Sequence, residues 1–392
     1  MEAGETAVSR LDQRALRLEH LDAKDLAHRP DEVNAGVALR ECDAHGFVGG
    51  AAHALQIDQP VERIVHPVHL PRDRSAANPL GASTDARHRV AWFMTEKRDV
   101  LEELIDILTL ERIEENIFRG QSQNLGWGRV FGGQVVGQAL SAAEQTVPED
   151  RHVHSLHGYF LRSGDADEPI AFLVDPIRDG RSFTTRRVVA VQNGKAIFNL
   201  AASFQIDEDG LDHQADVMPE VPGPDELLSE QDLGKRYLSK LPEAVVKGIP
   251  EAMRERIVAD RPIEVRPVTP IDPMRPKEHP PTKQVWFRAT GALPDQRSIH
   301  EYLIAYASDF HLLGTSMHPH SVTWLTPGMQ VASLDHAMWF HRRFRFDEWM
   351  LYDMDAPTSQ GSRGLSRGRW FTKDGTLVAT TAQEGLIRDR RK

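Results

Sequence analysis

A repeated pattern of turns places the strongest constraint on how this 392-residue chain can fold. Gly180 and Gly361 are 181 residues apart, and the dipeptides Asn193-Gly194 and Asp374-Gly375 repeat the same spacing. Each dipeptide separates two β-prone runs, which is the pattern of a tight β-hairpin. A second pair of segments, which begin at Ser155 and Ser333, is offset by 178 residues. These spacings indicate one domain of roughly 110 to 130 residues that occurs twice.

Each copy also carries one helical segment ahead of its strands. We expect these helices at residues 133–143 and 299–309. In the second, Ser298 and Glu301 match an S-x-x-E capping box, and apolar residues recur at helical spacing. Few positions of this segment are charged, so we expect it to be buried. One apolar helix enclosed by a long antiparallel sheet, twice over, predicts an α+β architecture.

The first 93 residues differ in composition from the rest of the chain. Residues 1–93 hold one Lys, no Tyr and three aromatic side chains, too few large apolar groups to fill a core. Met94 then opens a segment typical of a protein start followed by an amphipathic helix. We expect residues 1–93 to be an N-terminal extension, either disordered or the product of a misassigned start codon, with a regulatory arm as the alternative. The predicted domains are 94–206 and 259–392, joined by an acidic connector at 207–258.

Charge and cysteine content exclude several classes of function. A net charge of -11 argues against broad nucleic-acid binding, which needs a basic face. No run of eighteen uncharged apolar residues and no secretory signal pattern occur, so we expect no stable membrane insertion. Cys42 is the only cysteine and cannot form an internal disulfide, which favours a cytoplasmic protein. The histidines have no companion cysteines and no H-E-x-x-H helix, so we expect no metal site.

Several segments between residues 94 and 392 resemble the acyl-CoA thioesterase II family. The segments that carry the resemblance, in chain order, are Phe118-Arg-Gly-Gln-Ser, Val130-Phe-Gly-Gly-Gln-Val-Val-Gly-Gln-Ala-Leu, Ser155-Leu-His-Gly-Tyr-Phe-Leu-Arg, Tyr306-Ala-Ser-Asp, Asp335-His-Ala-Met-Trp-Phe-His-Arg and Gln383-Glu-Gly. The resemblance implies a double-hotdog fold, two tandem sheets each wrapped around a central helix. It implies hydrolysis of fatty acyl-CoA to fatty acid and CoA by direct attack of water, without a cofactor, in a homo-oligomer.

Matching the family's catalytic residues one at a time implies an active site of Asp309, Ser333 and Gln383. The sequence departs from the family at Ser333, where bacterial relatives more typically carry Thr. Serine keeps the hydroxyl but lacks the β-branch that restricts its rotamer, so it should position water less tightly.

The chemistry of these three residue types supports the assignment independently. Hydrolysis requires water to lose a proton, and Asp309, at the edge of the apolar helix face and partly desolvated, is a plausible general base. Ser333 and Gln383 can each donate and accept hydrogen bonds and so hold a water against it. The alternative is that Asp309 caps the chain after its helix while the other two satisfy backbone groups.

The first repeat offers no matching carboxylate, because aligning the two helices places Ala139 opposite Asp309. We therefore expect one active site per chain. Gly132 and Gly133 are candidate oxyanion donors at a helix start, although close helix packing explains these glycines equally well. The residues that bind CoA stay unknown: the pairs Arg186-Arg187 and Arg342-Arg343 and the tail 388–392 could meet its phosphates, or they could be solvated edges of the sheet.

Three alternative functions require weighing. Gly364-Leu-Ser-Arg-Gly368 matches the G-x-S-x-G pattern of a serine nucleophile, but the residues around Ser366 predict a hairpin and not a strand followed by a helix. A hotdog-fold enoyl-CoA hydratase would carry an Asp-x-Asn-Pro-x-His segment, where this chain has Asp309-Phe-His-Leu-Leu-Gly. A non-catalytic acyl-CoA-binding protein would release no thiol from an acyl-CoA. Acyl-chain preference depends on the depth of a tunnel and does not follow from the sequence.

Overall fold

The computed structural model describes residues 99–391 apart from 127, 242, 244–245, 247–250 and 274. The predicted extension, residues 1–93, lies outside the described residues. The first half of the described chain contains α1 (Val100–Leu108), β1 (Glu111–Glu114), β2 (Ile117–Gly120), α2 (Gly132–Glu144), β3 (Arg151–Phe160), β4 (Ile170–Asp179), β5 (Phe183–Gln192) and β6 (Lys195–Ile206).

Short helices follow, and then a second set of strands. The segment after β6 contains the 3-10 helix η1 (Pro224–Glu226) and the helices α3 (Glu230–Lys240) and α5 (Glu251–Val258). The second half contains β7 (Ile263–Pro267), β8 (Thr282–Ala289), α6 (Arg297–Ala307), α7 (Leu312–Thr315), the 3-10 helix η2 (His318–His320), β9 (Met329–Ser333), β10 (Asp335–Phe340), β11 (Met350–Gln360), β12 (Arg363–Thr372) and β13 (Leu377–Asp389). No helix of the described residues is long and apolar enough to cross a membrane.

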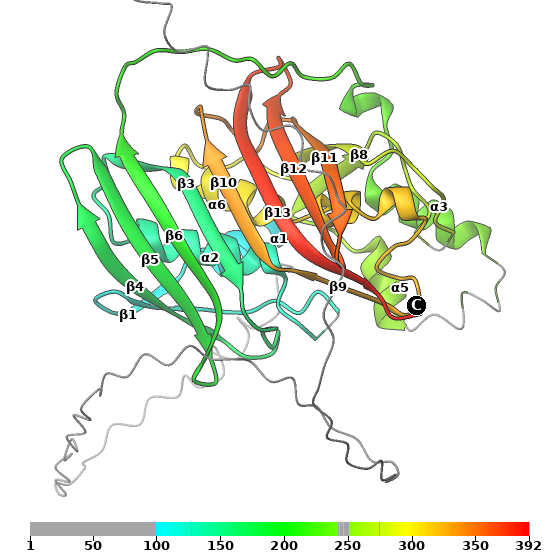
Figure 1. The fold of residues 1–392 in the computed structure, drawn as a ribbon, viewed down its shortest axis with the longest axis horizontal. Coiled ribbons are helices and arrows are strands. Elements are labelled where there is room, and N and C mark those ends of the chain that lie inside the picture. Colours follow the sequence, from blue (N-terminus) through cyan, green and yellow to red (C-terminus); the bar gives the residue numbers. More distant parts are fainter. Residues whose placement is uncertain are drawn as a thin grey trace, which may run out of the picture. The chain divides into compact units, whose positions relative to one another are not determined.

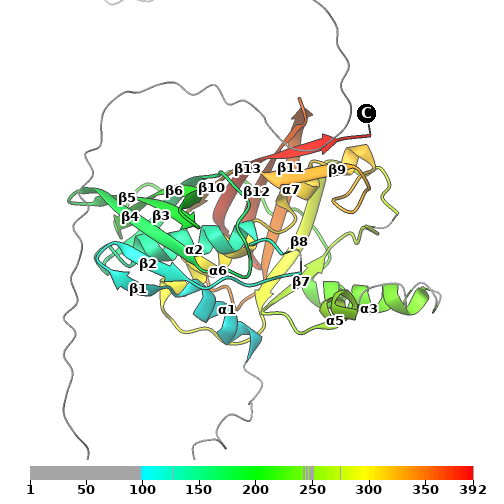
Figure 2. The ribbon, with the colours of Figure 1, turned by 90° about the horizontal axis from the view of Figure 1, so that it is seen from below.

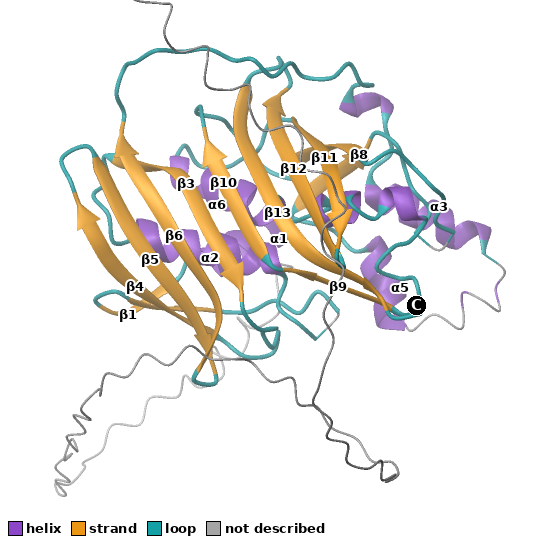
Figure 3. Cartoon of the chain, in the orientation of Figure 1, coloured by secondary structure: helices purple, strands orange, loops and turns teal. Residues whose placement is uncertain are grey.

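The described strands form one antiparallel sheet in the order β1-β2-β4-β5-β6-β3-β10-β13-β12-β11-β8-β7, with β9 paired to β13. The two halves join where β3 pairs with β10, in the middle of the sheet (Figures 1 and 3). The helices α2 and α6 lie on the same side of this sheet (Figure 2). Each half is thus an antiparallel sheet around one central helix, which confirms the predicted α+β double-hotdog fold.

Matching irregularities in the two halves reveal the duplication. The predicted hairpin turns are present, with Asn193 and Gly194 at φ values of 50° and 71° and Gly375 at 88°. The register of β4 on β5 shifts between Asp175 and Arg178, and that of β11 on β12 shifts between Asp355 and Thr358. Each irregular stretch contains a proline, which has no N–H to donate to a sheet.

The central helices are buried, as predicted, but α6 begins differently from the prediction. Its first residue is Arg297, its N-cap is Gln296, and that residue makes no capping hydrogen bond through its side chain. The predicted capping box is therefore wrong: Ser298 and Glu301 both lie inside the helix, buried. The cause is a local ion pair, since the Arg297 guanidinium contacts Glu301 at 2.7 Å one turn later and extends the helix backwards.

Glycines allow α2 and α6 to pack with their backbones close together. A Cβ atom on Gly133 would lie 2.1 Å from the carbonyl oxygen of Tyr306, and one on Gly137 would lie 3.2 Å from that of Tyr302. The contacts run in opposite directions along the two helices, so α2 and α6 are antiparallel. The start of each helix consequently lies beside the end of the other, and this arrangement builds the site described next.

Candidate active site

The structure brings the three predicted catalytic residues together from three elements of the second half. Asp309 follows α6 by two residues, Ser333 ends β9, and Gln383 lies within β13. The Gln383 amide nitrogen donates to Asp309 Oδ1 at 2.6 Å, and the Ser333 hydroxyl donates to the same oxygen at a longer 3.4 Å. The Asp309 side chain is thus held by both residues chosen as its partners.

A break between β9 and β10 allows Ser333 to reach the site. The strand β13 pairs with β10 over residues 379–382 and with β9 over residues 385–389. At the break, the backbone N–H of Glu384 donates to the side chain of Asp335 at 2.7 Å. In a regular strand, residues 333 and 336 would point to opposite faces, because side chains alternate. The break turns both Ser333 and His336 toward the interior, where each contacts a member of the site.

The first half contributes the start of α2 to the site. The backbone N–H of Gly133 donates to Asp309 Oδ2 at 3.0 Å. A Cβ atom on Gly132 would lie only 2.6 Å from the same oxygen, so the glycine pair is what lets the carboxylate approach. The positive end of α2 stabilises the negative charge of Asp309 and so opposes the unfavourable dipole of its own helix. In this structure the Gly133 N–H is occupied by Asp309, so it is not a free oxyanion donor.

Aromatic side chains border Asp309 on one side. Phe131, the N-cap of α2, stacks on Phe310 with ring centroids 4.4 Å apart, and it meets the edge of Tyr306 at 5.2 Å. Burial raises the pKa of the Tyr306 phenol well above its usual value, so this ring stays neutral. These rings form an apolar cluster at the end of α6, next to Asp309 in the chain.

Sequence reasoning missed a buried polar chain behind Gln383. His336 lies between the Ser308 hydroxyl, 2.8 Å from Nε2, and the Gln383 amide nitrogen, 3.3 Å from Nδ1. The Tyr352 hydroxyl donates to the Ser308 carbonyl oxygen at 2.9 Å. The available signal was a histidine within the apolar strand segment that follows Asp335, but its partners depend on tertiary packing.

The first half contains a carboxylate at the position that corresponds to Asp309, contrary to our expectation. The helices α2 and α6 begin at residues 132 and 297, an offset of 165, which matches Asp309 to Glu144 and not to Ala139. Glu144 interacts with Ser298 near the start of α6, as Asp309 does with Gly133 at the start of α2. The counterpart of Gln383, from the 181-residue offset of the strands, is Ala202. The first half therefore keeps an acid but lacks the amide.

The Glu144 carboxyl group is buried close to a second carboxyl group, that of Glu301. Burial raises the pKa of Glu144 to about 7, although Tyr302 and Ser298 oppose the shift. Burial also raises the pKa of Glu301 to about 8, against the opposing effect of Arg297. One carboxylate oxygen of each is buried without a hydrogen-bond partner among the described residues. Burial thus favours the protonated form of both carboxyl groups near neutral pH.

The arginine pairs that could have met CoA phosphates are engaged within the chain. Arg186 is buried and donates to Asp179 and to Thr146, while Arg187 pairs with Asp175 at 2.8 Å. Arg342 pairs with Asp212, and Arg343 pairs with Asp207. These contacts favour the structural interpretation of both pairs.

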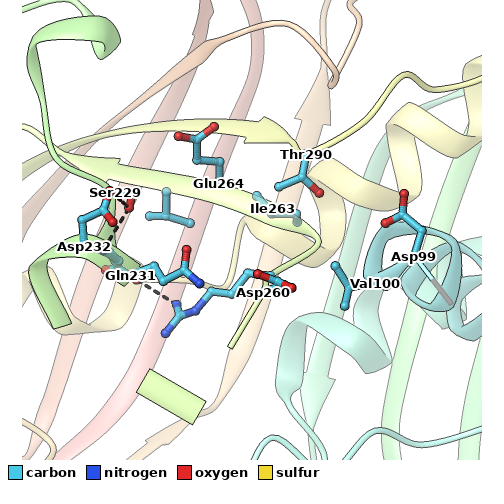
Figure 4. Close-up of a pocket in the computed structure, with 12 residues that line it drawn as sticks. Asp99, Val100, Ser229, Gln231, Asp232, Asp260, Ile263, Glu264 and Thr290 are labelled. Atoms are coloured by element: carbon cyan, nitrogen blue, oxygen red, sulfur yellow. Dashed lines mark hydrogen bonds and ion pairs between the residues drawn. The ribbon is translucent and has the colours of Figure 1, made fainter. Parts of the chain in front are cut away.

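A cavity of about 470 Å³ lies beside α3 and β7 and is lined by none of the three predicted residues (Figure 4). Its walls carry five acidic side chains against one arginine, Arg261; the five are Asp99, Glu230, Asp232, Asp260 and Glu264. Acidic walls repel a polyphosphate, so this cavity is a poor site for CoA.

Two further sequence patterns concern the G-x-S-x-G segment around Ser366 and a possible metal site. Ser366 lies inside β12, whose next element is β13, so it lacks the helix that a nucleophile elbow requires. No group of three or more His, Cys, Asp or Glu that could hold a metal ion occurs in the described part of the chain.

Comparison with known proteins shows which family the chain resembles. Residues 122–205 match the family described as "Acyl-CoA thioesterase N-terminal domain", and residues 252–386 match "Acyl-CoA thioesterase". "Acyl-CoA thioesterase 2" of Haemophilus influenzae is 43% identical over 290 residues, which cover 74% of this chain and 98% of that protein. The chain belongs to the acyl-CoA thioesterase II family. It is an enzyme that hydrolyses acyl-CoA thioesters, as the sequence predicted.

Other members of the acyl-CoA thioesterase family agree with this assignment. Human "Acyl-coenzyme A thioesterase 8" is 43% identical over 284 residues, which cover 72% of this chain and 88% of that protein. Among solved structures, an acyl-CoA thioesterase II from Mycobacterium marinum, TesB2, is 43% identical with a TM-score of 0.56, covering 73% of this chain and 98% of its own. A Mycobacterium avium tesB protein is 30% identical with a TM-score of 0.59, covering 74% and 99% of the two chains.

Proposed function

We propose that this thioesterase hydrolyses fatty acyl-CoA by direct attack of a water molecule that Asp309, Ser333 and Gln383 activate. The observation that carries the proposal is the setting of Asp309, whose two oxygens take hydrogen bonds from Gln383, Ser333 and Gly133. These donors fix the carboxylate in place, and a fixed carboxylate near a thioester carbonyl can accept a proton from water.

The reaction proceeds in two steps. Asp309 accepts a proton as the water oxygen bonds to the thioester carbon, which gives a tetrahedral intermediate. The carbon–sulfur bond then breaks, and the protonated Asp309 returns its proton to the departing CoA thiolate. The products are one carboxylic acid and free CoA, and no oxidant, metal or cofactor is needed for this balance.

Ser333 and Gln383 position the water in this proposal. The distance of 3.4 Å between the Ser333 hydroxyl and Asp309 is long for a hydrogen bond between oxygens, so the hydroxyl has room to turn toward a water. Gln383 is fully buried, so its amide keeps one orientation while a substrate enters.

The proposal also covers the domain boundaries, the number of active sites and the setting in which the enzyme works. We propose hotdog domains at 94–206 and 259–392 with a connector at 207–258, and one active site per chain, because Ala202 replaces the glutamine in the first half. We also propose a cytoplasmic homo-oligomer without a resident cofactor. The lone cysteine supports the cytoplasm, the hydrolysis contains no redox step that would need a cofactor, and the homo-oligomer follows from the resemblance to the family alone.

The direct test of Asp309 is the substitution Asp309→Asn, which keeps the shape of the side chain and removes its basicity. We expect kcat to fall by about 10²- to 10⁴-fold, the usual contribution of a general base. Thiol release from a series of acyl-CoA substrates measures the rate, and thermal unfolding verifies the fold. Asp150→Asn, at an exposed carboxylate after α2, is the control and should leave kcat unchanged. Turnover of Asp309→Asn near the wild-type rate would refute the assignment.

A further inference from the structure

A continuous chain of hydrogen bonds runs from the end of α6 through His336 to Asp309. The Ser308 hydroxyl lies 2.8 Å from His336 Nε2, the Gln383 amide nitrogen lies 3.3 Å from His336 Nδ1, and the same nitrogen lies 2.6 Å from Asp309 Oδ1. Ser308, His336 and Gln383 are each at most 1% exposed. The three side chains are therefore screened from bulk solvent, and each depends on the others for its hydrogen bonds.

The chemistry of Asp309 fixes which atoms of Gln383 face it. An ionised carboxylate accepts hydrogen bonds only, so the group at 2.6 Å must be the amide NH₂ and not the amide oxygen. One amide hydrogen points to Asp309, and the other is directed at His336 Nδ1, which must then accept. Reversing the amide would place its oxygen against the carboxylate, a repulsive contact.

The tautomer of His336 follows from the same reasoning. With Nδ1 as the acceptor, the imidazole proton must be on Nε2, where it donates to the Ser308 hydroxyl. That hydroxyl in turn donates a hydrogen bond to the Ala305 carbonyl oxygen at 2.8 Å, so every group in the chain has a consistent role as donor or acceptor. Burial lowers the pKa of His336, while the carboxylates of Asp309 and Asp335 oppose that shift, and the neutral ring is the form that the geometry requires.

One atom of this network has no partner. The amide oxygen of Gln383 is buried and accepts no hydrogen bond from the described residues. A buried acceptor without a donor is unfavourable, so such atoms persist where a ligand or water uses them. Since both amide hydrogens are committed, this oxygen is the only group of Gln383 left to bind the attacking water.

We infer that His336 is a positioning residue of the hydrolytic reaction, which holds the Gln383 amide in the orientation that presents its oxygen to water and its NH₂ to Asp309. The inference rests on the proposed roles of Asp309 and Gln383. It assigns no bond-making step to His336, because its ring contacts Gln383 and Ser308 and acts only through them.

A double-mutant cycle tests whether His336 acts through Gln383. His336→Ala should lower kcat by about tenfold or more in the wild-type background with KM within threefold, because a misplaced catalytic group loses rate and not binding. In the Gln383→Ala background, whose residual rate must exceed that of buffer, His336→Ala should change kcat by less than about twofold. His300→Ala, at a buried histidine of α6 bonded to Pro294 and Phe346, is the control and should have equal effects in both backgrounds.

A pair of near-isosteric substitutions covers the case in which His336→Ala does not fold. His336→Asn places an acceptor oxygen where Nδ1 lies and should rescue kcat to within about threefold of wild type. His336→Gln places its polar atom toward Ser308 and should remain as slow as His336→Ala. Equal losses of kcat in both Gln383 backgrounds, or equal rates for the Asn and Gln variants, would overturn the inference. A wild-type rate for Gln383→Ala alone would instead overturn the proposed function.

Discussion

The buried carboxyl group of Glu144 makes the stability of this thioesterase depend on pH in a defined direction. Burial raises the pKa of Glu144 from 4.5 to about 7 in the folded chain. Below the unfolded value both states hold the proton and the group has no effect. Between the two values the unfolded chain loses its proton while the folded chain keeps it, so stability falls as pH rises. Above the folded pKa both states are charged, and the penalty stays constant.

The size of the penalty follows from the shift. A rise of about 2.5 pKa units corresponds to about 3 kcal/mol at 1.36 kcal/mol per unit, and partial solvent screening of this half-buried side chain reduces it to about 1–3 kcal/mol. Glu144→Gln mimics the protonated acid and removes the penalty. The stability advantage of the variant over wild type should therefore grow by about 1–2 kcal/mol as the pH rises from 5.5 to 8.

Urea unfolding of the full chain, followed by tryptophan fluorescence at each pH, measures this gain. Glu149→Gln, at an exposed position in the loop after α2, is the matched control and should show a difference from wild type that does not change with pH. If Glu144→Gln likewise differs from wild type by the same free energy at pH 5.5 and pH 8, then Glu144 is charged in the folded chain across this range. The environment we describe for it would then be wrong.

Two further substitutions test the positions of the hydroxyl and the glycine in the site. Ser333→Ala should lower kcat by about tenfold or more, whereas Ser333→Thr keeps the hydroxyl and should stay within about threefold of wild type. Equal rates of thiol release for the two variants would show that the hydroxyl has no role in the mechanism. Gly133→Ala places a Cβ 2.1 Å from the Tyr306 carbonyl oxygen, so it should destabilise the fold by about 1–3 kcal/mol or more and lower kcat by separating α2 from Asp309. Gly314→Ala, where a Cβ meets nothing within 4 Å, is its control in thermal unfolding, and equal melting temperatures for the two variants would contradict the close helix packing.

Local turn chemistry explains why the sequence predicted the sheet well. Asn193-Gly194 forms a two-residue hairpin with both residues at positive φ, whereas Asp374-Gly375 lies in the four-residue loop 373–376, where Gly375 alone of the pair has positive φ. The fixed spacing of the two dipeptides exposed the duplication. The start of α6 was predicted less well. A capping box needs Ser298 outside the helix, but the ion pair between Arg297 and Glu301 places this serine within it.

The candidate site was only partly predictable for a different reason. Asp309, Ser333 and Gln383 came from a resemblance to known thioesterases, and the structure places them in contact. The roles of His336 and Glu144 were not visible, because each depends on tertiary structure. One needs the break between β9 and β10, and the other needs the antiparallel packing of α2 on α6.

The central claim is that water attacks the thioester directly and that Asp309 only moves protons. A single turnover in H₂¹⁸O, with enzyme in excess over acyl-CoA, tests it most directly. Mass spectrometry of the released acid and of the proteolytic peptide that contains Asp309 locates the label, with product incubated alone with enzyme as the control for exchange. We predict one ¹⁸O atom in the acid and none in the peptide. An acid without label, or ¹⁸O in Asp309, would show an anhydride with the enzyme that water opens at the Asp309 carbonyl, and would contradict direct attack.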